Sequence, residues 1–79
     1  MPSSHLLDLI ASTLSVDPGQ VSEHSDSKNT RNWDSLRQVI LMTELERIYN
    51  IEFEFEQIND ATSVSRIRAF LEQKGVAAA

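Results

Sequence analysis

The fold is decided by residues 34–49, DSLRQVILMTELERIY. Apolar residues recur in this stretch at steps of three and four, which is the period of one helix face. They are Leu36, Val39, Ile40, Leu41, Met42, Leu45, Ile48 and Tyr49. The remaining face carries Gln38, Glu44, Glu46 and Arg47. The pattern predicts a long amphipathic helix that directs Leu41, Leu45 and Ile48 into a core.

Asp34 and Ser35 stand where this helix should begin. The Asp34 side chain can accept from the amide hydrogens of the first turn, so we expect Asp34 to be the N-cap. Ser35 would then direct its hydroxyl outward near the positive end of the helix dipole. A phosphate ester on that oxygen would be favoured by roughly 0.3 to 1 kcal/mol at an exposed site. Taken alone, Asp34-Ser35-Leu36 also fits an ordinary helix start.

A shorter amphipathic helix is expected earlier in the chain, running to about Ser15. Its apolar face would consist of Leu6, Leu7, Ile10, Ala11 and Leu14. Ser3 or Ser4 is the expected cap, and Asp17-Pro18-Gly19 is the expected stop.

Residues 17–33 form a long polar connection between these two helices. Loops of this length are uncommon inside a compact domain and are usually functional or disordered. A crossover between two helices that lie side by side would explain the length, but a floppy polar linker over residues 22–30 fits as well. We expect Val21 and Trp33 to hold the ends of the connection to the core.

Residues 51–56, IEFEFE, alternate between apolar and acidic side chains, which is a strand pattern. Nothing else in the chain alternates convincingly, and an isolated two-stranded pairing would be marginal. We therefore expect an extended segment that packs Ile51, Phe53 or Phe55 on the helices, followed by a short helical turn from Gln57 to Ala61 with Ile58 inward.

A last helix is expected after a cap at Thr62 or Ser63. Its apolar positions repeat at helical steps: Val64, Ile67, Phe70 and Leu71. Lys74 suits the negative C-terminal end, and Gly75 suits the C-cap. We expect residues 1–3 and 76–79 to be frayed.

The composition fits a small helical domain. Seventy-nine residues make one domain, 1–79, and a core with only five aromatic residues must be built from Leu, Ile and Val. The fold class is therefore expected to be all-α: a small four-helix bundle of three main helices and one short helix, with a long loop between the first and second helices.

Charge and composition exclude several classes of function. The net charge of −5 would repel nucleic acid and anionic membrane surfaces. The absence of cysteine excludes disulfides and thiolate metal sites. No apolar run is long enough for a membrane span, and the N-terminus lacks a signal-peptide pattern. A cytoplasmic monomer is the default expectation.

The motif Trp33-Asp34-Ser35-Leu36 and the residues after it resemble the acyl carrier proteins. Those later residues are Val39, Leu41, Leu45-Glu46 and 49–53, YNIEF. The resemblance covers Leu6 to about Lys74 and includes the helix end at 14–16 and the segment 61–64. It implies that Ser35 carries 4′-phosphopantetheine, delivered from coenzyme A by a separate phosphopantetheinyl transferase. The chain would then not be an enzyme itself, and it would hold an acyl group as a thioester on the arm.

The resemblance also implies a set of site residues. Ser35 would be the attachment point, with Asp34 as the adjacent helix cap and Leu36 beside it. Loading and downstream biosynthetic enzymes would dock on Leu36, Val39, Ile40 and Glu44. Leu36 and Val39 could instead be core residues. Cargo enclosed in the bundle would contact Met42, Ile58, Ala61 and Val64, which core packing explains equally well.

Several positions depart from the carriers of bacterial fatty acid synthesis. Asn32-Trp33 precedes the motif where glycine and a small residue are typical, and Arg37, Ile40 and Arg47 stand where acidic residues are common. We therefore expect a specialised pathway. Since tryptophan before Asp-Ser also occurs in stand-alone amino acid carriers, a peptidyl or D-alanyl type of aminoacyl carrier is an alternative.

The two histidines predict neither a hydrolase nor a metal site. A serine hydrolase needs a histidine within reach of its nucleophile, but His5 and His24 lie in no motif that predicts such contact. His24 and Asp26 are too few to predict a metal site. A helical interaction module that is never modified remains a further alternative, because it would dock through the same apolar residues.

Overall fold

The computed structural model describes residues 5–76. Within that range the elements in chain order are α1 (His5–Leu14), the 3₁₀ helix η1 (Pro18–Gln20), α2 (Ser35–Tyr49), α3 (Phe55–Asp60) and α4 (Val64–Gln73). The described part is thus all-α, as predicted, and contains no β-strand. The expected caps Ser3 and Ser4, and the expected fraying at 1–3 and 77–79, lie outside the described residues.

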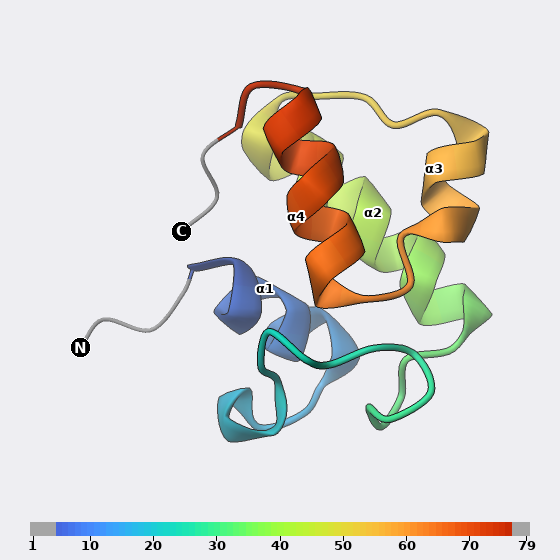
Figure 1. Ribbon diagram of the computed structural model, residues 1–79. Helices are drawn as coiled ribbons and strands as arrows, with labels where there is room; N and C mark the ends of the chain where they lie inside the picture. The colour runs from blue at the N-terminus through green and yellow to red at the C-terminus, as the bar shows by residue number, and fades with distance from the viewer. Residues whose placement is uncertain (1–4, 77–79) are drawn as a thin grey trace.

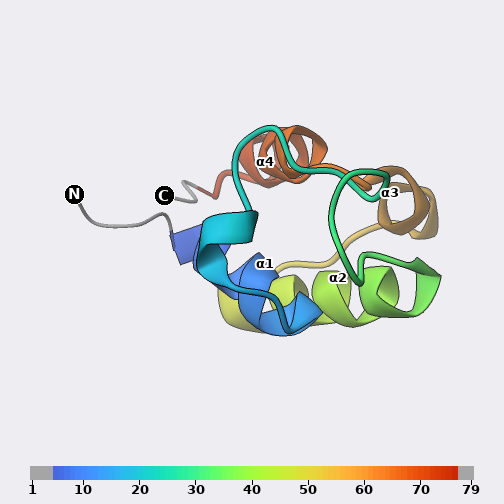
Figure 2. The ribbon, with the colours of Figure 1, turned by 90° about the horizontal axis from the view of Figure 1, so that it is seen from below.

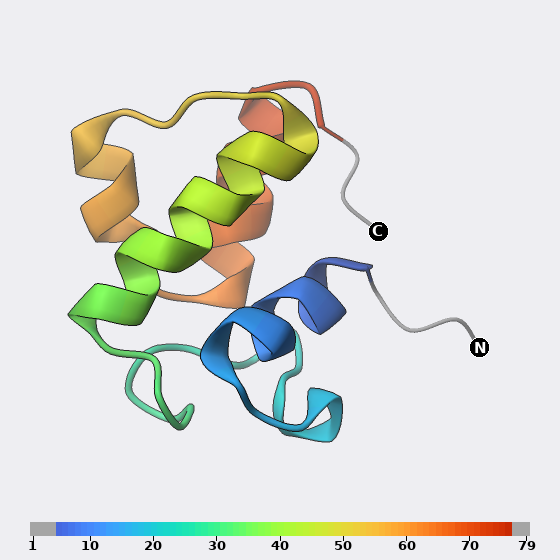
Figure 3. The ribbon, with the colours of Figure 1, turned by 180° about the vertical axis from the view of Figure 1, so that it is seen from behind.

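The helices are arranged in two layers around one core. Figure 1 shows α4 crossing in front of α2, with α3 beside them, and Figure 3 shows α2 as the long diagonal helix seen from behind. The view from below places α1 and α2 on one side, α3 and α4 on the other, and the connection before α2 across the near end (Figure 2). Fully buried apolar side chains fill the space between the layers: Leu6, Ile10, Leu14, Leu41, Met42, Leu45, Val64, Ile67 and Leu71.

The residues between α1 and α2 are held to the rest of the molecule. Val21 and Trp33 are buried in the core, as predicted. The carbonyl of Ser25 accepts from the Val64 amide at 3.0 Å, and the Ser27 amide donates to the Thr62 carbonyl at 2.9 Å. These bonds place residues 25–27 against the start of α4. The floppy-linker alternative is therefore wrong for this part of the segment.

An ion pair ties the same segment to the side of α4. Arg68 donates from Nε and Nη2 to the two carboxylate oxygens of Glu23, each at 2.6 Å. These hydrogen bonds lower the pKa of the Glu23 carboxyl below its ordinary value. The pair therefore stabilises the fold when Glu23 is ionised, and this contribution is lost as the pH falls through the lowered pKa.

Residues in the left-handed region end three of the helices. Ser15 follows α1 with φ 57°, Asn50 follows α2 with φ 56°, and Gly75 follows the end of α4 with φ 78°. At each end the next residue donates its amide to a carbonyl five residues back, as from Val16 to Ala11. This is the Schellman arrangement. The stop of α1 thus lies at Ser15, before the predicted Asp17-Pro18-Gly19.

The segment after α2 is extended, as predicted, but its aromatic residues divide differently. Phe53 is buried and lies under the Lys74 ammonium, 5.4 Å from the ring centre to Nζ. Phe55 is 77% exposed because α3 already begins there, earlier than the predicted turn at Gln57. The expected fraying at Val76 is also wrong, since this side chain packs on the core beyond the Gly75 turn.

Gly75→Ala tests the helix ending directly. An added Cβ would meet no atom within 4 Å, so only the positive φ opposes the substitution. We expect a loss of about 1 kcal/mol in the free energy of unfolding, because a residue with a Cβ is strained in the left-handed region. Thermal unfolding followed by circular dichroism measures it. Gly19→Ala is the matched control, since its surroundings are equally open and its φ is not positive. Equal effects of the two substitutions would contradict this explanation.

Candidate functional site

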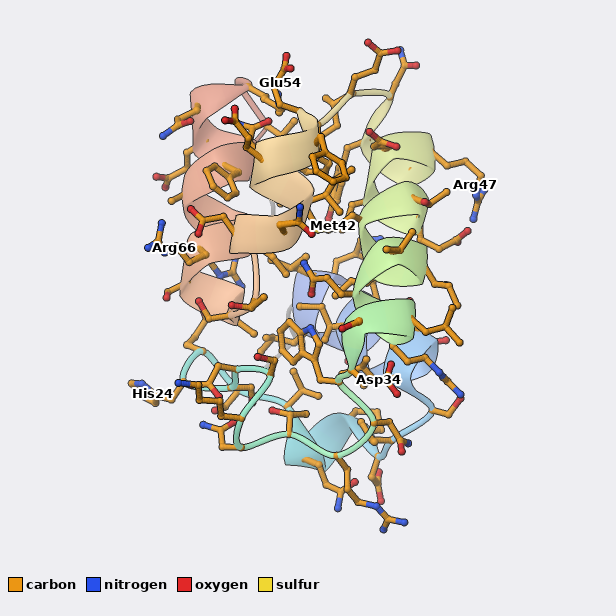
Figure 4. All side chains as sticks on the ribbon, turned by 90° about the vertical axis from the view of Figure 1, so that its right-hand side faces the viewer. His24, Asp34, Met42, Arg47, Glu54 and Arg66 are labelled. Carbon is orange, nitrogen blue, oxygen red and sulfur yellow. The ribbon has the colours of Figure 1, made fainter. Side chains whose placement is uncertain are left out.

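Ser35 is the first residue of α2 and its side chain is exposed. The N-cap is Asp34, as predicted, whose Oδ1 accepts from the Arg37 amide at 2.9 Å. Within residues 5–76, no hydrogen bond engages the Ser35 hydroxyl. The oxygen is therefore reachable from solvent at a helix start, where the backbone favours a negatively charged group. Figure 4 shows Asp34 at the end of α2 that meets the connection.

Side chains next to Ser35 fix this end of α2 to the end of α1. The Asn32 side chain donates from Nδ2 to the Leu14 carbonyl at 2.8 Å. Arg37 donates from Nη1 to the Thr13 carbonyl at 2.7 Å and to the Ser15 hydroxyl at 3.3 Å. The last carbonyls of a helix lack partners within the helix, and here two of them are satisfied from the neighbouring element. Asn32 and Arg37 therefore join the start of α2, where Ser35 lies, to the end of α1.

Gln38 is buried, which corrects its predicted place on the polar face of α2. Its Oε1 accepts from the Trp33 indole nitrogen at 2.6 Å. Its Nε2 donates to the carbonyls of Ile58 at 2.8 Å and Ala61 at 2.7 Å. One side chain therefore joins the residue before the motif, the first turns of α2 and the end of α3. Sequence reasoning missed this role, because the three partners are distant in sequence and a lone glutamine in a helix normally indicates a solvated face.

A hollow of about 230 Å³ lies beside Ser35, between the start of α2, the end of α3 and residues 27–33. Trp33, Gln38 and Val39 form part of its wall. Ser27, Asn59 and Thr62 complete the wall with hydroxyl and amide groups. No pattern in the sequence marks these three residues, because three separate segments supply the wall.

Beyond Ser35, α2 exposes an apolar strip formed by Leu36, Val39 and Ile40. Their side chains are 68%, 52% and 42% exposed, so the alternative that Leu36 and Val39 are core residues is wrong. Ile48, which was expected to point inward, is 37% exposed near the other end of α2. The core face of α2 is carried by Leu41, Met42 and Leu45.

Glu44 lies on the same helix and is paired within the chain. Arg47 donates from Nη2 to Glu44 Oε1 at 2.7 Å. This hydrogen bond lowers the pKa of the Glu44 carboxyl. Figure 4 shows Arg47 directed away from the bundle. The acidic charge near the apolar strip is thus partly balanced by a basic side chain of the same surface.

The residues considered for hydrolysis or metal binding lie apart from Ser35. His5 and His24 are both exposed, and Figure 4 shows His24 on the side of the connection away from Asp34. Among residues 5–76, no group of three or more His, Asp or Glu side chains is arranged to hold a metal ion. In the same range, none of the helices has the length and apolar character needed to cross a membrane.

The residues considered as a lining for enclosed cargo are packed in the interior. Met42, Ala61 and Val64 are fully buried, and Ile58 is partly buried against the same core. Figure 4 places Met42 between α2 and α3.

A scan against protein-family models finds none that matches the chain.

Proposed function

We propose that this protein is a carrier that holds an acyl group as a thioester on 4′-phosphopantetheine attached to Ser35, for a specialised biosynthetic pathway in the cytoplasm. The observation that carries the proposal is the exposed Ser35 hydroxyl, which has no hydrogen-bond partner within residues 5–76 and follows the Asp34 cap. The motif around it resembles that of acyl carrier proteins. The connection between α1 and α2 ends directly before this serine.

The chemistry requires little of the chain itself. The Ser35 oxygen would attack the phosphorus on the pantetheine side of the coenzyme A diphosphate. The bond to the adenosine-bearing phosphate breaks, the nucleotide leaves, and a base of the phosphopantetheinyl transferase takes the hydroxyl proton. The attached group supplies the thiol that this cysteine-free chain lacks. The role of α2 is to hold the oxygen outward at a rigid helix start, which Asn32, Arg37 and Asp34 support.

The apolar strip is the proposed docking surface for the transferase and for loading and downstream enzymes. Leu36, Val39 and Ile40 continue along α2 from Ser35, so one partner surface could contact both. Exposed apolar residues grouped beside a reactive group are typical of recognition surfaces. Glu44 would contribute at the edge of the contact. Its pairing with Arg47 makes strong attraction to basic partners less important than apolar contact.

Val39→Asp and Ile40→Asp are expected to slow modification of Ser35 without changing helical content or melting temperature. A charge in the strip must be desolvated on docking, whereas both positions are exposed in the free protein. Initial rates of arm transfer at limiting transferase measure the effect. Ile48→Asp is the matched control, because this isoleucine is also exposed on α2 but lies more than three turns from Ser35. Equal slowing in all three variants would count against a local docking strip.

Intact-mass measurement tests the proposed function itself. The purified chain is incubated with coenzyme A and a broad-specificity phosphopantetheinyl transferase. A mass increase of one phosphopantetheine unit, mapped to the peptide that contains residues 32–37, is the expected result. No increase with several transferases would favour the alternative of an unmodified interaction module. Challenge of the loaded form with acyl and aminoacyl donors then separates an acyl carrier from an aminoacyl carrier.

A further inference from the structure

The hollow beside Ser35 contains polar groups that the fold does not use. No hydrogen bond within residues 5–76 engages the hydroxyls of Ser27 and Thr62 or the side-chain amide of Asn59. All three groups line the same hollow as Ser35. Polar groups that converge on a concave site are available to orient a ligand. The complementary ligand is a chain of amide and hydroxyl groups with short apolar links.

Gln38 lies between Ser35 and the buried interior of the bundle. Along α2, Ser35, Gln38 and Met42 follow one another at steps of three and four, so they share one side of the helix. Gln38 is hydrogen-bonded on both ends of its amide, to Trp33 and to the end of α3. A ligand that entered between α2 and α3 would have to break these bonds and leave buried polar groups without partners, each costing about 1 to 3 kcal/mol.

We propose that the hollow, and not the core, receives the pantetheine arm, and that the cargo of this protein is a short polar acyl or aminoacyl group. This depends on the proposed modification of Ser35. Ser27, Asn59 and Thr62 bind the amide and hydroxyl groups of the arm, while Trp33 and Val39 contact its apolar links. The Gln38 junction keeps long alkyl chains out of the interior, where Met42 and Val64 are fully buried.

The dimensions of the site favour the same cargo. Its volume of about 230 Å³ is below the roughly 300 to 1,000 Å³ of pockets for drug-sized ligands, so it can hold only part of the arm and leaves no room for a long acyl chain. A second hollow of about 260 Å³ shares Ser27 and Thr62 with the first. Lys28, Asp60 and Arg66 line this second hollow. The residues next to the first hollow on this side are therefore charged and not apolar.

Amide-resolved NMR of the apo, holo and acylated protein tests the proposal. The arm is attached by transferase from coenzyme A, from 3-hydroxybutyryl-coenzyme A as a short polar probe, or from octanoyl-coenzyme A as a long apolar probe. We expect the holo form to shift the signals of Ser27, Asn59, Thr62 and the Trp33 indole. The octanoyl form should add no shift at Met42, Ala61 or Val64 and should not raise the melting temperature.

Two results would overturn the proposal. The first is a set of octanoyl-dependent shifts at Met42 and Val64 with a raised melting temperature, because these would place cargo in the core. The second is a holo form whose signals from the hollow coincide with those of the apo form, because the arm would then remain in solvent. Neither result touches the proposed function, whose failure would appear earlier as an unchanged intact mass.

Variants of the hollow give a second readout. Trp33 is the single tryptophan of the chain and lines the hollow, so its indole signal reports the arm. Asn59→Ala combined with Thr62→Val should remove most of the holo-dependent indole shift while the intact mass still shows full modification. Gln73→Ala is the control, because it removes an exposed amide from the far end of α4 and should leave the shift unchanged. An undiminished shift in the variant of the hollow would contradict the assignment of these residues.

Discussion

Replacing Gln38 with alanine is expected to lower the free energy of unfolding by about 3 kcal/mol. The substitution removes a buried side chain and leaves the Trp33 indole N–H and the carbonyls of Ile58 and Ala61 without their partner. For a domain of this size such a loss corresponds to a fall of roughly 12 to 24 °C in melting temperature. Chemical denaturation followed by circular dichroism measures the free energy directly. A small domain has only about 5 to 15 kcal/mol in total, so this one residue is a large share.

Two further variants separate hydrogen bonding from packing. Gln38→Met keeps most of the volume but supplies no donor or acceptor of comparable strength, so it should recover only the packing part of the loss. Gln73→Ala makes the alanine substitution at an exposed site of α4 and should change stability by less than about 0.5 kcal/mol. If Gln38→Met were as stable as the wild type, the three hydrogen bonds of Gln38 would contribute nothing to the fold.

Ser35→Ala is expected to abolish attachment of the phosphopantetheine arm completely. The substitution removes the oxygen that forms the phosphodiester, and no change elsewhere restores it. The fold should persist, because alanine is at least as favourable as serine inside a helix and the Asp34 cap is unchanged. Intact mass after treatment with coenzyme A and transferase provides the readout, and circular dichroism verifies the helical content.

Ser65→Ala is the matched control for this loss. Ser65 is also an exposed serine in the first turn of a helix, since α4 begins at Val64 after the Ser63 cap. It should gain the arm as the wild type does. A mass increase that survives in Ser35→Ala, or that disappears in Ser65→Ala, would show that the transferase uses another serine and would remove the basis of the carrier proposal.

Local signals predicted most of the fold. The cap Asp34, a cap at Thr62 or Ser63, the ending at Gly75 and the anchors Val21 and Trp33 were all predicted, because each depends on the chemistry of one residue or on a helical period. Of the two candidates for the cap of α4, the structure has Ser63. The apolar face of α1 was predicted for the same reason. The exposed place of Ser35 followed from its position directly after a cap.

The contacts that distant segments make with each other could not be predicted. Gln38 was assigned to the wrong face because its partners are Trp33 and the end of α3, which no periodicity connects to it. The hollow lined by Ser27, Asn59 and Thr62 was missed because residues 27–33, the start of α2 and residues 59–62 form its wall together. The exposure of Phe55 was missed because the alternating pattern of 51–56 ends where α3 begins.

The left-handed residues that close α1, α2 and α4 have a consequence for how this chain tolerates change. Each helix is stopped by its own last residues, so its length does not depend on the loop that follows. The exposed stretch 17–20, directly after the first of these stops, could therefore accept inserted residues without α1 growing into them. A reporter sequence placed there would interrupt only the short 3₁₀ helix η1 and would leave α1 and α2 as they are.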